Sequence, residues 1–101
     1  MKKRFVLLAV LICRHLMMFS QYSVSGIVKD ENGNALTGAN VVIQHTYTGA
    51  ITNLKGEFML KGIQQGDHTL IISFLGFETV SKPVTVNNNV SLDIQLSRKA
   101  F

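Results

Sequence analysis

The chain has 101 residues and a formal net charge of +4, which is enough sequence for one small domain. The excess positive charge lies in the first 21 residues, because from Tyr22 onward six Lys or Arg residues balance six Asp or Glu residues. No basic stripe remains to neutralise phosphates, which excludes nucleic acid as a partner.

Residues 1–21 predict a signal peptide, helical in form, that directs the chain to export. "MKKRF" supplies a positive start, "FVLLAVLIC" a short apolar run, and "MFSQ" small or polar residues near a cleavage point. The apolar run is shorter than the ~20 residues that a membrane span needs, and Arg14 and His15 interrupt it. This interruption leaves two alternatives to the signal peptide open. The segment is a membrane-embedded anchor, or the start of the protein chain has been assigned at the wrong position.

Cys13 is the only cysteine. The sequence "VLIC" loosely resembles the lipobox of bacterial lipoproteins, but Ile12 is large where that box has a small residue. Lipidation of Cys13 is therefore the less favoured alternative. Cleavage near Gln21 would leave a mature chain without disulfide, zinc-thiolate or Cys-nucleophile chemistry.

Apolar and polar residues alternate along most of the remaining chain, which is typical of strands with one buried face. Five runs show the pattern, at residues 23–29, 39–45, 56–62, 68–77 and 89–97. The predicted inward residues are Val24, Gly26, Val28, Ala39, Val41, Ile43, Phe58, Leu60, Leu70, Ile72, Phe74, Val90, Leu92, Ile94 and Leu96.

Turn-forming segments rich in Gly and Asn, such as "DENGN" and "NNN", separate these runs. Short strands at close spacing without helices predict an all-β fold, a single seven-stranded antiparallel β-sandwich. Pro83 in "SKPVTV" cannot donate a ladder hydrogen bond, so this run is predicted to be an edge strand or to carry a bulge. The domain is predicted to cover residues 22–97, with a short tail at 98–101.

The order of the landmarks resembles the carboxypeptidase-regulatory-like domain, a transthyretin-like sandwich. The matching positions are Gly26, Val28, Asp30, Gly33, Gly38, Ala39, Val41, Thr48, Gly49, Thr52, Gly56, Phe58, Leu60, Gly66, Leu70, Phe74, Gly76 and Phe77. The chain departs from the family at Thr37, where proline is usual, and at Asn53, where the turn is usually acidic. Both departures concern turns, so the expected fold is unaffected.

The resemblance implies a non-catalytic accessory module without a cofactor. In exported bacterial proteins such domains precede the plug and barrel of TonB-dependent outer-membrane receptors, which import nutrients. The chain is then a fragment of a receptor gene or a free-standing copy, located in the periplasm or associated with the outer membrane. A protein in either place is the expected partner, and the oligomeric state is left open.

The segment "KDENGNALTGANVVI" raises the alternative of a calcium loop, because Asp30, Asn32 and Asn34 alternate as oxygen ligands do. An EF-hand loop needs Gly at its sixth position and Glu at its twelfth. Counted from Asp30, these positions hold Ala35 and Val41. The segment is therefore predicted to be a loop between two strands, without a metal.

No other arrangement in the sequence indicates a metal site or catalysis. His45 and His68 lack neighbours at metal-ligand spacing, and His68 is predicted to be a partly buried strand residue. The serines show no nearby His–acid arrangement, and the acids are not paired. The sequence predicts that the chain is not an enzyme.

A surface for protein contact is predicted at the loop "TYTGAITNLKG", residues 46–56, and at the sheet edge "ETVSKPV", residues 78–84. Its residues are Tyr47, Thr48, Asn53, Lys55, Glu78 and Lys82. Two alternatives remain, a carbohydrate-binding module and an accessory domain of a secreted peptidase. Polysaccharide binding would require Tyr47 and Phe77 to form an exposed stacking pair.

Overall fold

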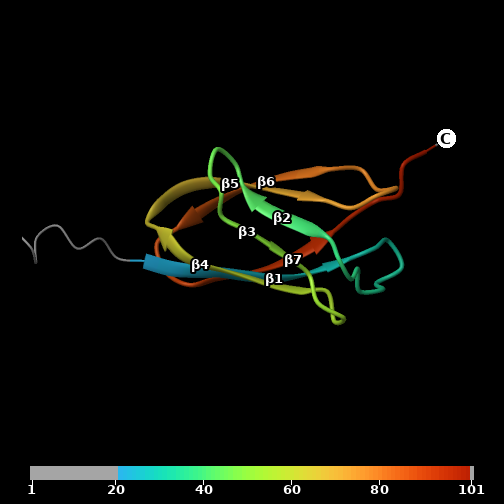
Figure 1. The fold of residues 1–101 in the computed structure, drawn as a ribbon, viewed down its shortest axis with the longest axis horizontal. Helices are drawn as coiled ribbons and strands as arrows, with labels where there is room; N and C mark the ends of the chain where they lie inside the picture. Colours follow the sequence, from blue (N-terminus) through green and yellow to red (C-terminus); the bar gives the residue numbers. More distant parts are fainter. Residues whose placement is uncertain (1–20, 101) are drawn as a thin grey trace, which may run out of the picture.

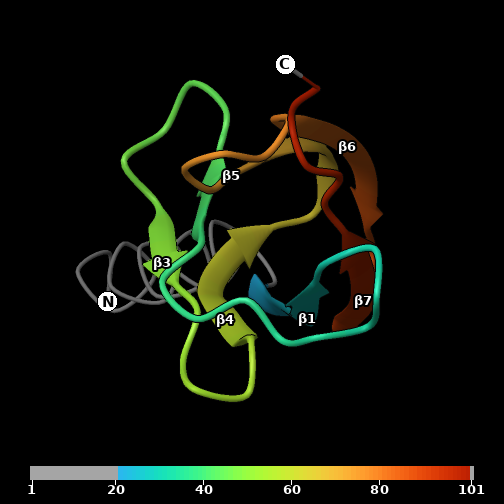
Figure 2. The same cartoon turned by 90° about the vertical axis from the view of Figure 1, so that its right-hand side faces the viewer.

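A computed structural model describes residues 21–100. The predicted signal peptide, apart from Gln21, lies outside the described residues, as does Phe101. The described chain folds into two facing sheets, which Figure 1 shows from the side and Figure 2 from one end.

One sheet has three strands and the other has four. The three-stranded sheet has the order β4 (Glu57–Gln64), β1 (Gln21–Lys29), β7 (Val90–Gln95). The four-stranded sheet has the order β3 (Gly49–Ile51), β2 (Asn40–Ile43), β5 (Gly66–Ser73), β6 (Val80–Val86). The seven-stranded all-β sandwich predicted from the sequence is thus confirmed.

One pairing differs from the antiparallel arrangement that the sequence predicts. Strands β1 and β7 run in the same direction, with a register from Val24 opposite Val90 to Lys29 opposite Gln95. All other strand pairs are antiparallel. Alternation of apolar residues fixes which face of a strand is buried but not the direction of its neighbour, and β1 and β7 are separated by the whole intervening chain.

Most of the predicted inward residues lie in the core between the sheets. Val24, Val28, Val41, Leu70 and Ile72 are fully buried. Phe74, Val90 and Leu92 are exceptions, since they are only partly buried, whereas Phe77 is buried. The two rings pack edge to face with centroids 5.5 Å apart.

Gly26 allows β1 to approach its neighbours closely. A Cβ atom at this position would lie 2.9 Å from the ring of Phe58 on β4 and would overlap the main-chain oxygen of Leu92 on β7. A side chain at Gly26 would therefore separate β1 from one of its two partners.

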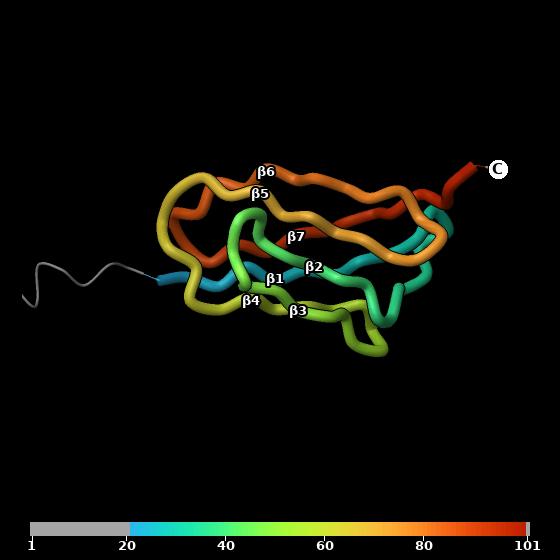
Figure 3. The backbone as a smooth tube through the Cα atoms, turned by 45° about the horizontal axis from the view of Figure 1, so that its top comes forward, coloured from blue at the N-terminus to red at the C-terminus, as the bar shows by residue number. Residues whose placement is uncertain are grey.

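The segment after β7 pairs with the connection between β5 and β6. Glu78 N–H donates to the Ser97 carbonyl over 2.8 Å, and Lys99 N–H donates to the Gly76 carbonyl over 3.0 Å. The Arg98 guanidinium lies 5.4 Å from the centroid of the Phe77 ring. Figure 3 shows β1 beginning at one end of the molecule and the chain after β7 leaving at the other.

The Thr52 hydroxyl joins two loops inside the protein. It donates to the Leu36 carbonyl over 2.5 Å and accepts from Ala39 N–H over 2.8 Å. Thr52 is 3% exposed, so water does not replace these bonds. The hydroxyl fixes the start of β2 against the end of β3.

Thr52→Val should lower the free energy of unfolding by about 1–3 kcal/mol for each buried group left without a partner. Thr52→Ser keeps the hydroxyl and should cost less, about 1 kcal/mol for the lost methyl group. Urea denaturation of the two variants measures the difference. Equal destabilisation by both would contradict the role of the hydroxyl.

Candidate functional site

Asp30 organises the loop between β1 and β2. Its Oδ1 accepts hydrogen bonds from the N–H groups of Asn32 and Asn34, each over 2.9 Å, and its Oδ2 accepts from the Asn34 side-chain amide. The main chain closes the same loop, with Asp30 N–H donating to the Asn34 carbonyl over 2.9 Å. The predicted strand-connecting loop is confirmed, and the carboxylate serves as an acceptor for its own turn.

These hydrogen bonds hold the pKa of Asp30 below its ordinary value of 3.8. The main-chain N–H of Asn34 is the largest cause, and Asn32 and the positive charge of Arg98 act in the same direction. Partial burial of the carboxyl group opposes them. The charged form of Asp30 therefore stabilises the folded chain.

The two histidines of the described chain have separate environments. His45 is exposed and has a positive φ of 64° in the turn after β2. His68 is half-buried on β5, as predicted, and its Nε2 lies 2.8 Å from the Gln64 carbonyl oxygen. Within residues 21–100 no three His, Cys, Asp or Glu side chains converge as metal ligands do.

The residues of the predicted contact surface do not form one patch. Tyr47 and Thr48 lie in the connection from β2 to β3, whereas Asn53 and Lys55 lie in the connection from β3 to β4. These connections are at opposite ends of β3, a strand that lies within the segment 46–56 predicted as one loop. Glu78 and Lys82 lie near β6, at the opposite edge of the same sheet.

Asn53 has a structural role in its loop. Its Oδ1 accepts from Lys55 N–H over 3.0 Å and from Glu57 N–H over 2.9 Å, and its amide donates to the Glu57 carboxylate over 3.2 Å. Asn53 N–H donates to the Glu57 carbonyl over 3.0 Å. Asn53 therefore closes the turn between β3 and β4, while Lys55 stays exposed at its tip.

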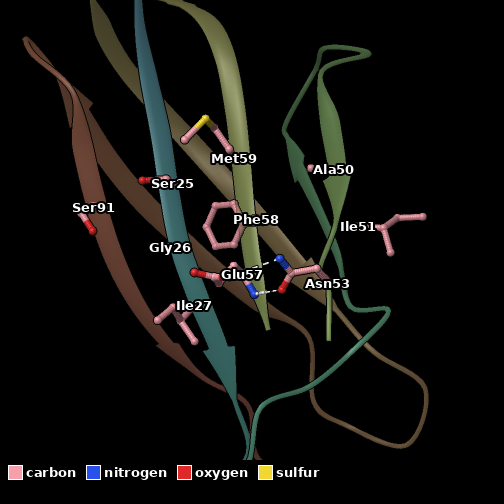
Figure 4. Close-up of a pocket in the computed structure, with 10 residues that line it drawn as sticks. All are labelled: Ser25, Gly26, Ile27, Ala50, Ile51, Asn53, Glu57, Phe58, Met59 and Ser91. Atoms are coloured by element: carbon pink, nitrogen blue, oxygen red, sulfur yellow. Dashed lines mark hydrogen bonds between the residues drawn. The ribbon is translucent and has the colours of Figure 1, made fainter. Parts of the chain in front are cut away.

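Beyond this turn, β3 and β4 separate and an open groove of about 590 Å³ lies along them. Its lining comes from β1, β3, β4 and β7, as Figure 4 shows. The lining residues are Ser25, Gly26, Ile27, Ala50, Ile51, Asn53, Glu57, Phe58, Met59 and Ser91.

The groove has unpaired main-chain groups on both sides. The main-chain groups of Thr52 form hydrogen bonds with Gly38 and Ala39, at the start of β2. Successive residues of a strand point their main-chain groups to opposite sides, so those of the preceding residue, Ile51, point away from β2. Asn53 N–H donates to the Glu57 carbonyl, so the main-chain groups of Glu57 point toward β3. Because these groups alternate in direction along a strand, those of Met59, two residues later, also point toward β3. Among the described strands no ladder joins β3 to β4, since each is the edge strand of a different sheet.

Exposed apolar side chains border the same groove. Ile51 is 70% exposed and Met59 is 53% exposed, and Leu54 is exposed in the adjoining turn. Met59 occupies a solvent-facing position of β4, between inward Phe58 and Leu60. Open edges combined with exposed apolar residues are features of a protein-contact surface.

The opposite edge of the four-stranded sheet is blocked by Pro83. Gln44 N–H donates to the Thr69 carbonyl, so the main chain of Thr69 faces β2 and not β6. Pro83, which is opposite Thr69, is therefore at a position without ladder bonds, and its nitrogen faces the free edge. The edge position predicted for this strand is confirmed.

The exposed pair that polysaccharide stacking would require is not formed. Tyr47 is fully exposed, but Phe77 is 8% exposed because Phe74 and Arg98 pack against its ring. The condition that the carbohydrate-binding alternative requires is therefore not met. The cause is the segment after β7, which pairs with the residues around Phe77.

Two facing sheets with an open groove at one side define this chain as a small β-sandwich. It belongs to the CarboxypepD_reg-like domain family, whose sequence profile it matches over residues 24–101. The predicted resemblance is thus confirmed. Among residues 21–100 no helix is long and apolar enough to cross a membrane.

Two curated relatives are TonB-dependent receptors. Receptor SusC of Bacteroides thetaiotaomicron is 44% identical over 72 residues, covering 71% of this chain. Receptor P39 of Formosa agariphila is 26% identical over 76 residues, covering 75% of this chain. The chain spans 7% of the length of each receptor.

Solved structures share the fold at low sequence identity. A cohesin–X-dockerin complex of Acetivibrio cellulolyticus matches with a TM-score of 0.70 and 22% identity, covering 76% of this chain and 58% of that one. Catechol 1,2-dioxygenase of Acinetobacter radioresistens matches with a TM-score of 0.67 and 10% identity, covering 81% and 53%. These likenesses concern the fold alone.

Asp30→Asn should lower stability at neutral pH, because the charged carboxylate is the better acceptor. A lowered folded-state pKa contributes stability above pH 3.8, and this contribution is lost as the pH falls through the folded-state pKa. The difference between wild type and Asp30→Asn should therefore shrink in acid. Denaturation at a series of pH values measures it, with Asp93→Asn on the exposed face as the control, and a constant difference would contradict the assignment.

Proposed function

We propose that this chain is the N-terminal accessory domain of a TonB-dependent nutrient receptor and has no catalytic activity of its own. The 44% identity to receptor SusC is the observation that carries the proposal. The domain is exported and faces the periplasm, where it contacts another protein. The receptor relatives favour this setting over that of a secreted peptidase.

The groove between β3 and β4 is the surface best suited to this contact. Its main-chain groups offer an edge to which an extended segment can add. Ile51 and Met59 supply apolar area beside that edge. Of the predicted contact residues, Asn53 and Lys55 adjoin the groove, whereas Glu78 and Lys82 belong to the side blocked by Pro83.

The size of the native product tests the receptor setting. An antibody against this domain, applied to fractionated cell envelopes, should detect a far larger outer-membrane protein. A small periplasmic species of about the mature length would contradict the receptor setting. It would instead identify a free-standing copy.

Substitution of the groove tests the contact surface. Ile51→Thr with Met59→Thr keeps residues that favour strands and removes apolar area. Binding of a receptor-associated partner should weaken by about tenfold or more, since a central interface side chain contributes over ~1 kcal/mol. The melting temperature should change little, because both side chains are exposed.

Glu78→Ala with Lys82→Ala is the matched control at the other edge. This control should bind the partner as the wild type does, measured by titration with the purified partner. Unchanged binding by the groove variant would exclude the groove. Loss of binding by the control alone would place the contact at β6.

A further inference from the structure

We propose that the domain has a mechanical function: it resists tension applied between the start of β1 and the end of β7. Three neighbouring strands, β4, β1 and β7, provide this resistance through their directions and their order in the sheet.

The first and last strands form a parallel ladder. Six residue pairs align β1 with β7, and Leu96 N–H extends the ladder by donating to the Lys29 carbonyl over 2.8 Å. Figure 1 shows both arrows pointing the same way, so the start of β1 and the end of β7 lie at opposite ends of the sheet. Tension between these ends pulls the two strands past each other along their length.

Sliding loads all bonds of the ladder together. Ladder hydrogen bonds run across the strands, so a force along the strands shears every bond at once. A force that separates two neighbouring ends instead loads the bonds one after another. The same set of bonds therefore resists shear more strongly than unzipping.

The position of β1 adds a second ladder to the resistance. β1 is the central strand of its sheet and pairs with β4 on its other side. Pulling β1 out also removes Val24 and Val28, both fully buried, from the core. Withdrawal of the first strand thus breaks two ladders and part of the core in one step.

The segment after β7 is the weaker part of the load path. Two main-chain bonds hold residues 97–99 to the connection before β6. These bonds give way first, and the tension then falls on the ladder between β1 and β7. A short early extension should precede the main unfolding event.

Single-molecule pulling in two directions tests the proposal on one protein. Cys13→Ser removes the native thiol, and exposed Gln21, Asn88 and Lys99 supply attachment sites when replaced by cysteine. The pair Gln21→Cys and Lys99→Cys applies shear. The pair Gln21→Cys and Asn88→Cys pulls apart the neighbouring starts of β1 and β7, because Val24 is opposite Val90.

We expect the most probable unfolding force to be at least about twofold higher in the shear geometry, since forced unfolding follows the unfolding rate along the pulling direction. Thermal melting of both variants establishes that they share one fold and one stability. Equal forces in the two geometries, or a lower force in shear, would overturn the proposal. The comparison uses identical hydrogen bonds, so a difference in force reports direction and not stability.

Discussion

The hydrogen bonding of β1 on both sides is the constraint on which the rest of the structure depends. In the three-stranded sheet β4 and β7 do not pair with each other, and each of them pairs with β1. Its inward residues Val24 and Val28 also form part of the core. Without β1, both outer strands of this sheet would lose their ladders, and the four-stranded sheet would lose the face on which it packs.

The same constraint makes the fold non-local. Ser23 at the start of β1 donates to the Asn89 side chain, 66 residues later. Pairing over such a separation closes a long loop before it gains contacts, which slows folding. The hairpin of β5 and β6 is by contrast local, since a short connection joins its strands.

The sequence allowed the buried faces to be predicted because alternation is a local property. Val41 and Ile43 on β2 and Phe58 and Leu60 on β4 are buried as their spacing indicates. The direction of β7 could not be predicted, since a strand of either direction buries the same residues. The exposed pair of Tyr47 and Phe77 could not be excluded from the sequence, because the burial of Phe77 depends on Arg98 in the last segment.

The groove was predicted only in part, since the contact loop expected at residues 46–56 includes Ile51 and Asn53 but none of the lining residues of β4. Ile51 belongs to a three-residue strand too short to show alternation. Met59 gave the one available signal, an apolar side chain at an outward position of β4. That signal acquires a meaning only when β3 is placed beside β4, which no local pattern specifies.

Asn53 and Thr52 illustrate what a family resemblance adds. Both were noted as family positions, Thr52 as a landmark and Asn53 as a departure from the acidic turn. The structure gives each a hydrogen-bonding role: Asn53 accepts two main-chain N–H bonds, as an aspartate would. Residue type alone does not reveal that the Thr52 hydroxyl is buried between two loops.

Pro83 has a consequence for how copies of this chain can associate. Growth of a fibre by edge-to-edge stacking requires that each copy offer two open edges of the same sheet. In the four-stranded sheet β3 is open, but the nitrogen of Pro83 interrupts the donors along β6. Stacking through this sheet therefore stops at a closed pair of copies, so a strand-rich protein with one open edge here does not extend into a fibre.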